Sequence, residues 1–264
     1  MPKKITSLSN SNIKDVVRLK EKRYRDQSGL TIVEGAREIR MALEAGVRAE
    51  ECYFSGKLLN ADGKTLLSSL EKSGAVLIEI SPEIYRKIAY GEREEGIIAV
   101  CSFKPYVQGE IYLDKDPLVV VIENIEKPGN LGAILRTAEA AGADGVIVCD
   151  QKADLWNANV IRASLGTVFR IKPAVMAKEE AAKFLKSRNI KVYAATPRAK
   201  KIYTEGDYKG PVALIVGSED KGLSEFWMRA ADEQVKIPMH GKIDSLNVSA
   251  STAILLYEAL RQRQ

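Results

Sequence analysis

The chain alternates between short apolar runs and segments whose apolar residues recur at helical spacing. Short apolar runs bounded by glycine or polar residues are typical of buried β-strands, and a spacing of three to four residues is typical of amphipathic helices. A polar segment over residues 9–29 predicts a basic helix capped by Asn10 or Ser11. After it, the pattern predicts strands at 30–34, 51–54, 76–80 and 96–103, and helices at 36–45, 65–73 and 82–88.

The second half of the chain shows the same alternation with stronger apolar runs. It predicts strands at 118–122, 145–149, 191–195, 211–216 and 234–237, and helices at 131–141, from 157, 179–188 and 249–261. A turn-rich stretch, KPYVQGEIYLDKDP, separates the two halves. We therefore predict a smaller N-terminal α/β domain over 1–105, a linker over 106–116 and a second α/β domain over 117–264. In a parallel β/α arrangement, ligand groups gather on loops at the carboxyl ends of the strands.

Composition narrows the class of protein. The chain has 264 residues, of which 45% are hydrophobic and 28% charged, as expected of a globular protein with real cores. Its apolar runs are strand-sized, so we expect neither a membrane span nor a signal peptide. Three cysteines in no CxxC pair and a single histidine, His240, make a disulfide framework or a metal site unexpected. The expected compartment is the reducing cytoplasm.

The positive charge is concentrated at the N-terminus. Residues 1–25 hold eight Lys and Arg residues against Asp15 and Glu21, a net charge of +6, whereas the whole chain carries +5. A concentrated basic segment suits a polyanion such as RNA. A solvated surface helix explains the same charge equally well.

Three polar loops that follow predicted strands are candidates for chemistry. The first, after strand 118–122, contains Asn130 at a predicted helix start and Arg136 two turns further on; a capping Asn and a surface Arg are the structural alternative. The second, GSEDKGLS at 217–224, has the glycine spacing of a phosphate loop but carries Leu223 where that loop needs lysine. The third, over 237–251, leads into the final helix, which Asn247 or Ser249 could cap.

Taken together and in order, these loops resemble a known family. The strings N-x-G-A-I-L-R-T-A, G-S-E-x-x-G-L-S and I-P-M-x-G-x-x-x-S-L-N-V-S-A are similar to the three motifs of the SpoU (TrmH) family, ribose 2′-O-methyltransferases of the SPOUT superfamily. The similarity spans about residues 118–264. The stretch I-V-E-G-x-R-E at 32–38 resembles the small α/β RNA-binding domain that many members carry.

The resemblance implies a fold and a cofactor site. The fold is an α/β domain whose C-terminal chain forms a deep trefoil knot, a topology that pattern alone does not predict. The knot holds S-adenosylmethionine, largely through backbone contacts. The positions that match the family's cofactor contacts are Thr196, Gly217, Ile237 and Leu246.

The resemblance also implies a catalytic cluster, which maps onto Asn130, Arg136, Glu219, Ser245 and Asn247. The sulfonium already activates the methyl group, so no metal is needed. The family's proposed general base is Arg136. Because a guanidinium has no acceptor site, we expect Arg136 chiefly to hold the target phosphate and orient the ribose 2′-hydroxyl. Members act as homodimers, and the final helix is the candidate contact; packing within one subunit is the alternative.

We therefore predict an S-adenosylmethionine-dependent ribose 2′-O-methyltransferase of structured RNA, with large-subunit ribosomal RNA favoured over tRNA. A non-catalytic RNA-binding or ribosome assembly factor is an alternative, as is a small-molecule α/β enzyme. Two further features are interpreted as parts of the solvent-exposed surface rather than as functional sites. His240 is more simply an exposed loop residue than a base, and the basic loop with Arg198, Lys200, Lys201 and Tyr203 is more simply solvated than RNA-bound.

Overall fold

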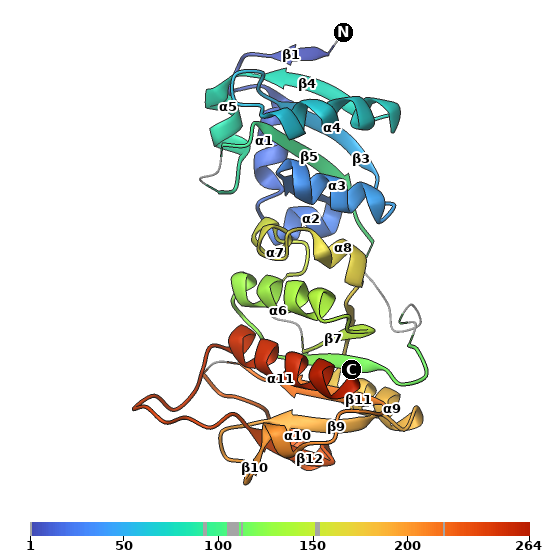
Figure 1. The fold of residues 1–264 in the computed structure, drawn as a ribbon. Coiled ribbons are helices and arrows are strands. Elements are labelled where there is room, and N and C mark those ends of the chain that lie inside the picture. The colour runs from blue at the N-terminus through green and yellow to red at the C-terminus, as the bar shows by residue number, and fades with distance from the viewer. Residues whose placement is uncertain (1, 92–93, 105–110, 112, 151–153, 219) are drawn as a thin grey trace. The chain divides into compact units, whose positions relative to one another are not determined.

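The computed structural model of the chain describes residues 2–91, 94–104, 111, 113–150, 154–218 and 220–264. The chain forms two compact units (Figure 1). Unit 1 comprises residues 1–105 together with 154–170, and unit 2 comprises 106–153 and 171–264. The apolar pattern assigns residues 154–170 to the C-terminal domain, whereas in the structure they pack with the N-terminal residues.

Long-range contacts explain why residues 154–170 belong to unit 1. The guanidinium of Arg25, which is 2% exposed, is ion-paired with Asp154. The Thr31 hydroxyl donates to the Trp156 carbonyl over 2.6 Å, and the Trp156 ring stacks on Phe103 with centroids 4.8 Å apart. Each of these contacts joins residues that are far apart in the sequence. A local apolar pattern carries no information about such contacts.

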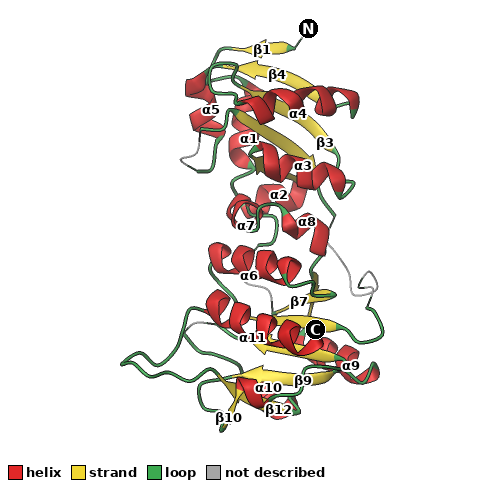
Figure 2. Ribbon diagram, in the orientation of Figure 1, coloured by secondary structure: helices red, strands yellow, loops and turns green. Residues whose placement is uncertain are grey.

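Unit 1 contains a mixed sheet with helices packed on it (Figure 2). In the part of the chain that the structure describes, the sheet has five strands in the order β1-β4-β3-β5-β2, and β5 runs antiparallel to β2 and β3. The strands are β1 (Lys3–Ile5), β2 (Leu30–Glu34), β3 (Ala49–Phe54), β4 (Val76–Ile80) and β5 (Ile97–Ser102). The helices are α1 (Ser11–Arg18), α2 (Lys22–Ser28), α3 (Ala36–Glu44), α4 (Ala61–Lys72), α5 (Pro82–Ile88), α7 (Ala158–Ala163) and α8 (Thr167–Ile171), the last ending one residue into unit 2.

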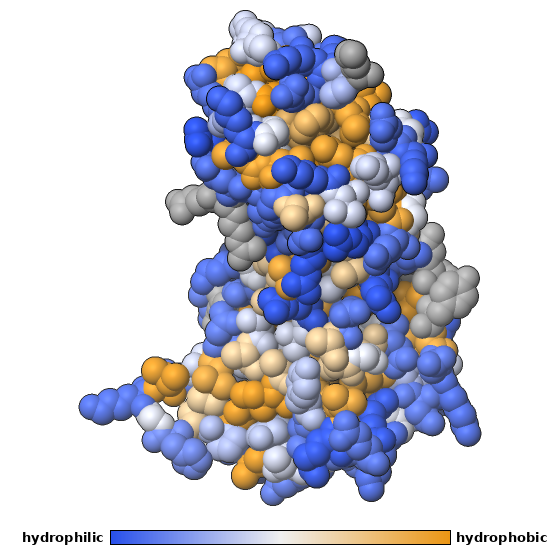
Figure 3. Space-filling model, turned by 45° about the horizontal axis from the view of Figure 1, so that its top comes forward, coloured by the Kyte–Doolittle hydropathy of each residue, from blue (hydrophilic) through white to orange (hydrophobic). Residues whose placement is uncertain are grey.

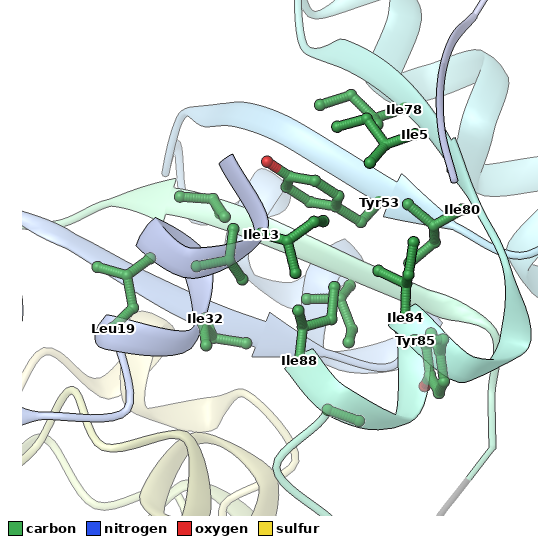
Figure 4. Close-up of a cluster of buried hydrophobic side chains, with 14 residues drawn as sticks. Ile5, Ile13, Leu19, Ile32, Tyr53, Ile78, Ile80, Ile84, Tyr85 and Ile88 are labelled. Carbon is green, nitrogen blue, oxygen red and sulfur yellow. The ribbon is translucent and has the colours of Figure 1, made fainter. Parts of the chain in front are cut away.

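One apolar cluster of unit 1 joins its sheet to α1 and α5. Figure 4 shows Ile13 of α1, Ile84 and Ile88 of α5 and Tyr53 of β3 within this cluster. All four side chains are fully buried. At about 25 cal/mol per Å² of apolar surface removed from water, such burial is the main stabilising contribution.

Unit 2 is built on a parallel sheet, as the β/α alternation predicted. Among the residues described, it has seven strands in the order β10-β12-β9-β11-β6-β7-β8, and every neighbouring pair is parallel. The strands are β6 (Leu118–Glu123), β7 (Gly145–Cys149), β8 (Ala174–Met176), β9 (Lys191–Ala195), β10 (Lys201–Ile202), β11 (Val212–Val216) and β12 (Glu233–Lys236). The helices are α6 (Pro128–Ala140), α9 (Lys178–Ser187), α10 (Glu225–Ala230) and α11 (Val248–Arg263), with a 3-10 turn at Tyr203–Glu205. Burial on both faces explains the continuous apolar runs of β6, β7 and β11.

The structure corrects several predicted element bounds. The basic segment 9–29 forms two helices, α1 and α2, rather than one, although Asn10 does cap α1 by accepting from the Asn12 backbone N–H over 2.9 Å. Helix α6 begins at Pro128 rather than at 131, because proline is well suited to a first helical turn. The pattern missed β1, β8, β10, α8 and α10, which are two to six residues long and too short for a periodic signal.

The described residues contain neither a membrane-spanning helix nor a cluster of metal-ligating side chains. No described helix is long and apolar enough to cross a bilayer. No group of three or more His, Cys, Asp or Glu residues in the described ranges is placed to hold a metal ion. Cys52, Cys101 and Cys149 are free and buried, and burial raises the pKa of each thiol to about 12.

Candidate active site

One cavity of unit 2, termed the main cavity because two motif loops line it, lies where three neighbouring parallel strands end. Loops after β9, β11 and β12 surround a space of about 480 Å³, within the range of small-molecule sites. These strands are adjacent in the sheet, in the order β12-β9-β11. Since the strands are parallel, their carboxyl ends meet at one edge, which is where the sequence placed ligand groups.

All four predicted cofactor residues line this one cavity. Thr196 follows β9, Gly217 follows β11, and Ile237 and Leu246 belong to the segment between β12 and α11. Ser245, predicted as part of the catalytic cluster, lines it as well. Thr196 is buried, and its backbone N–H donates to the Val235 carbonyl over 2.9 Å, which ties the β9 loop to β12.

The β11 loop has a close backbone approach that only glycine allows. A Cβ on Gly217 would lie 2.3 Å from the carbonyl carbon and oxygen of Gly222, and Gly222 itself has a φ of +64°. The Gly222 N–H donates to the Ser218 carbonyl over 2.8 Å and closes the loop. Gly217 and Gly222 therefore allow the loop to close on itself at the cavity wall. The similarity of their spacing to that of a phosphate loop did not predict this role.

Two predicted catalytic residues meet beside the cavity. The Asn247 side-chain amide donates to the Asn130 carboxamide oxygen over 3.2 Å. Asn247 also caps α11, as predicted, because its Oδ1 accepts from the Ser249 backbone N–H over 3.0 Å. Asn130 lies in the first turn of α6 and lines a smaller space of about 60 Å³ with Ser218, Asp220 and Lys221, which also line the main cavity.

Arg136, also predicted as catalytic, is placed differently. Arg136 is exposed on α6, two turns beyond Asn130, and lines neither of the two cavities. Glu219 lies outside the described residues. The structure therefore brings together Asn130, Asn247 and Ser245 around the cavity edge and does not bring Arg136 to it within one chain.

Several cavity residues were missed by the sequence interpretation. Glu225 and Met228 reach the cavity from α10, an element that the apolar pattern did not predict. Lys221, Asp244 and Arg198 supply charges of both signs. Arg198 belongs to the basic loop interpreted as solvated, so at least this member of the loop faces the cavity. His240, in contrast, is exposed as expected.

The basic N-terminal segment is partly committed to internal contacts. Arg25 is buried in its ion pair with Asp154 and also donates to the Leu19 carbonyl over 2.6 Å. The Lys20 ammonium donates to the carbonyls of Lys87 and Ala89, at 3.0 and 2.7 Å, and burial lowers its pKa. Neither cation is available to a phosphate, although Lys14 and Arg23 remain exposed.

Two family profiles match separate parts of the chain. The profile of the SpoU rRNA Methylase family matches residues 117–257, and that of the MRM3-like substrate binding domain matches residues 10–99. The chain is 30% identical over 255 residues to the 23S rRNA (guanosine(2553)-2′-O)-methyltransferase RlmP of Bacillus subtilis, covering 97% of this chain and 98% of the relative.

Solved structures show the same fold over the full length. A crystal structure of an RNA 2′-O ribose methyltransferase aligns with a TM-score of 0.90 at 40% identity, covering 98% of this chain and 99% of that one. An AdoMet-bound rRNA methyltransferase from Sinorhizobium meliloti aligns with a TM-score of 0.90 at 28% identity, covering 99% and 98%. The predicted fold class, a C-terminal α/β domain of the SPOUT type with a smaller N-terminal α/β domain, is confirmed by these alignments.

Proposed function

This chain belongs to the SpoU rRNA methylase family, and on that premise we propose that it transfers a methyl group from S-adenosylmethionine to a ribose 2′-hydroxyl of large-subunit ribosomal RNA. The relatives named above act on RNA riboses, and one of the aligned structures holds the cofactor. The match of residues 10–99 to a substrate-binding domain supports RNA contact by unit 1.

The observation that carries the proposal is the convergence of the second and third motif loops and of the loop after β9 on one cavity. Thr196, Gly217, Ile237 and Leu246 come from loops far apart in sequence and line the same space of about 480 Å³. The lining suits the cofactor: Ile237, Met239 and Leu246 offer apolar contact for an adenine ring, and the loops offer backbone N–H and C=O groups. Charges of both signs suit an amino acid moiety.

The proposed roles follow from placement. S-adenosylmethionine, when bound, supplies a methyl group activated by the sulfonium. Asn130 and Asn247, hydrogen-bonded to each other at the cavity edge, would orient the ribose beside it. Ser245 and Glu219 belong to the same proposed cluster. Arg136 would hold the target phosphate with its forked N–H donors and thereby orient the 2′-hydroxyl, with the phosphate assisting proton removal.

We further propose a homodimer in which α11 contributes to the contact. Leu256 of this helix is fully buried within the unit, but Tyr257 beside it is 50% exposed. Apolar side chains also reach the surface elsewhere in unit 2, including Ile243 at 62% exposure, and Figure 3 shows apolar patches on the face in view. Light scattering on the pure protein would test this proposal, with Tyr257→Asp as the disrupting variant.

We also propose a C-terminal knot and a cytoplasmic location. The C-terminal trefoil knot that the family resemblance implies is supported by the way residues 237–248 return to the cavity formed after β9 and β11. A cytoplasmic location is supported by three free, buried thiols, which fit a reducing compartment.

A methyl-transfer assay tests the function directly. The protein is incubated with labelled S-adenosylmethionine and total bacterial RNA, and the label is located by RNA size and nuclease digestion. We expect label on a ribose of the large-subunit RNA, and its loss in Arg136→Ala. Label confined to tRNA would redirect the substrate assignment. Binding of S-adenosylmethionine without label on naked RNA or on ribosomal particles would favour a non-catalytic RNA-binding factor.

A further inference from the structure

A buried carboxylate connects the first two motif loops of unit 2. Glu123 ends β6, a strand that is otherwise entirely apolar, and its side chain is completely buried. One carboxylate oxygen accepts from the Ser224 backbone N–H over 2.8 Å, and the other accepts from the Ser224 hydroxyl over 2.7 Å. A single serine thus holds both oxygens of this buried acid, across 101 positions of sequence.

The partner of Glu123 terminates the loop that forms the cavity wall. Ser224 directly follows residues 217–223, of which Gly217, Ser218 and Leu223 line the main cavity, and it is the N-cap of α10. The start of that loop is continuous with β11, and the Ser218–Gly222 contact closes its middle. Glu123 therefore fastens the far end of the loop to the strand from which the first motif loop departs.

We propose that Glu123 is a positioning residue for cofactor binding, acting through Ser224 to hold Gly217, Ser218 and residues 220–223 in their binding conformation. The inference rests on the proposed function, because it assumes that the main cavity takes S-adenosylmethionine. Its physical basis is preorganisation: a loop already held in the bound geometry loses less conformational freedom when the ligand binds. A hydrogen bond to a carboxylate is also about twice as strong as one between neutral groups.

The role differs from that of an ordinary structural carboxylate, and the same strand offers a comparison. At the other end of β6, the Asp144 side chain accepts from the Leu118 backbone N–H over 2.7 Å. Asp144 thus fastens the start of the strand, but neither it nor Leu118 lines the cavity. Loss of either carboxylate lowers stability, whereas only loss of the Glu123–Ser224 contact weakens cofactor binding.

Four variants of the full chain separate these effects, with the dissociation constant of S-adenosylmethionine measured by calorimetry and Tm measured alongside. Ser224→Ala removes the hydroxyl but keeps the backbone donor, and Glu123→Gln turns one acceptor into a donor facing Ser224. We expect Ser224→Ala to raise the dissociation constant by about fivefold. Glu123→Gln should raise it by at least about tenfold, which equals about 1.4 kcal/mol of binding free energy. Ser224→Thr keeps both donors and restores binding to within about twofold. Asp144→Asn lowers Tm and leaves the dissociation constant unchanged.

Turnover provides a second readout. If Glu123 positions the loop, the KM for S-adenosylmethionine rises in Ser224→Ala while kcat at saturating cofactor stays within about twofold. Parent-like dissociation constants in folded Ser224→Ala and Glu123→Gln would overturn the inference and leave the proposed function standing. Should Glu123→Gln fail to fold, Ser224→Ala alone decides. A parent protein that binds no S-adenosylmethionine would refute the proposed function and this inference together.

Discussion

The side-chain amide of Asn247 donates to the side-chain oxygen of Asn130 over 3.2 Å, and this contact joins residues 117 positions apart. Asn247 uses its other side-chain atom, Oδ1, to cap α11. The predicted cap is therefore confirmed, and the side-chain nitrogen stays available to a different partner, so the proposed catalytic role does not conflict with it.

The two roles of Asn247 can be separated by substitution. Asn247→Asp keeps the capping oxygen but cannot donate to Asn130, so we expect near-parent Tm and a kcat lower by about a hundredfold, as for a misplaced substrate-orienting group. Asn247→Ala loses both contacts and should also cost about 1 kcal/mol of stability through the lost cap. Methyl-transfer kinetics and thermal unfolding of the two variants check this. Parent-like turnover in Asn247→Asp would remove the residue from the catalytic cluster.

Arg136 should matter for turnover and hardly at all for folding. Because its side chain is exposed, Arg136→Ala should leave the free energy of unfolding within about 0.5 kcal/mol of the parent. It should lower kcat by about a hundredfold or more. Arg136→Lys should also be impaired, since a lysine ammonium cannot form the forked contact to a phosphate. A lysine variant with near-parent turnover would contradict the phosphate-holding role.

Gly217 should tolerate no side chain. In Gly217→Ala the new Cβ would meet the Gly222 carbonyl group at 2.3 Å, so the loop must move and cofactor binding should fall by about tenfold or more. Gly210→Ala is the matched control, because no atom beyond its own chain neighbours lies within 4 Å of its added Cβ. Calorimetric titration with S-adenosylmethionine compares them. Equal affinity in both variants would mean that the loop geometry is not needed for binding.

The buried Arg25–Asp154 pair should make a large contribution to the stability of unit 1. Arg25→Ala leaves a carboxylate without its cation in a largely buried place, where the expected loss is about 3–5 kcal/mol. Arg23→Ala, a neighbouring exposed cation, should change stability by less than about 0.5 kcal/mol. Urea unfolding measures both. If the two variants unfold at the same urea concentration, the ion pair is not the anchor of residues 154–170.

Acid should weaken unit 2 through Glu233. Hydrogen bonds from Lys191 and Lys201 lower the pKa of this carboxyl below its usual 4.5. A depressed folded-state pKa contributes stability that is fully present above the unfolded-state pKa and is lost as the pH falls through the folded-state value. Urea unfolding between about pH 5 and pH 3 should therefore show a steeper loss in the parent than in Glu233→Gln. Parallel profiles would exclude this contribution.

The local elements of this protein could be predicted from the sequence because they depend on local patterns. The apolar runs of β6, β7 and β11 located three buried strands, and their parallel order followed from alternation with helices. The family resemblance, rather than any local pattern, implied that Thr196, Gly217, Ile237 and Leu246 share one site, and the structure brings all four to one cavity. Residue type and spacing are sufficient to predict the strands and helices, since such predictions rest on periodicity and turn chemistry.

Only the tertiary structure decided the partners of polar and charged side chains. The concentrated N-terminal charge suggested that Arg25 contacts RNA, but the fold buries it against Asp154. Glu123 ends an otherwise apolar strand, and only the fold shows that its partner is Ser224. Residues 154–170 likewise belong to unit 1, and not to the predicted C-terminal domain, because of their contacts with residues 1–105. Each of these pairs is separated by more than 100 positions, and burial strengthens such contacts by removing water. Local periodicity does not indicate which group, distant in the sequence, will lie beside a given polar side chain.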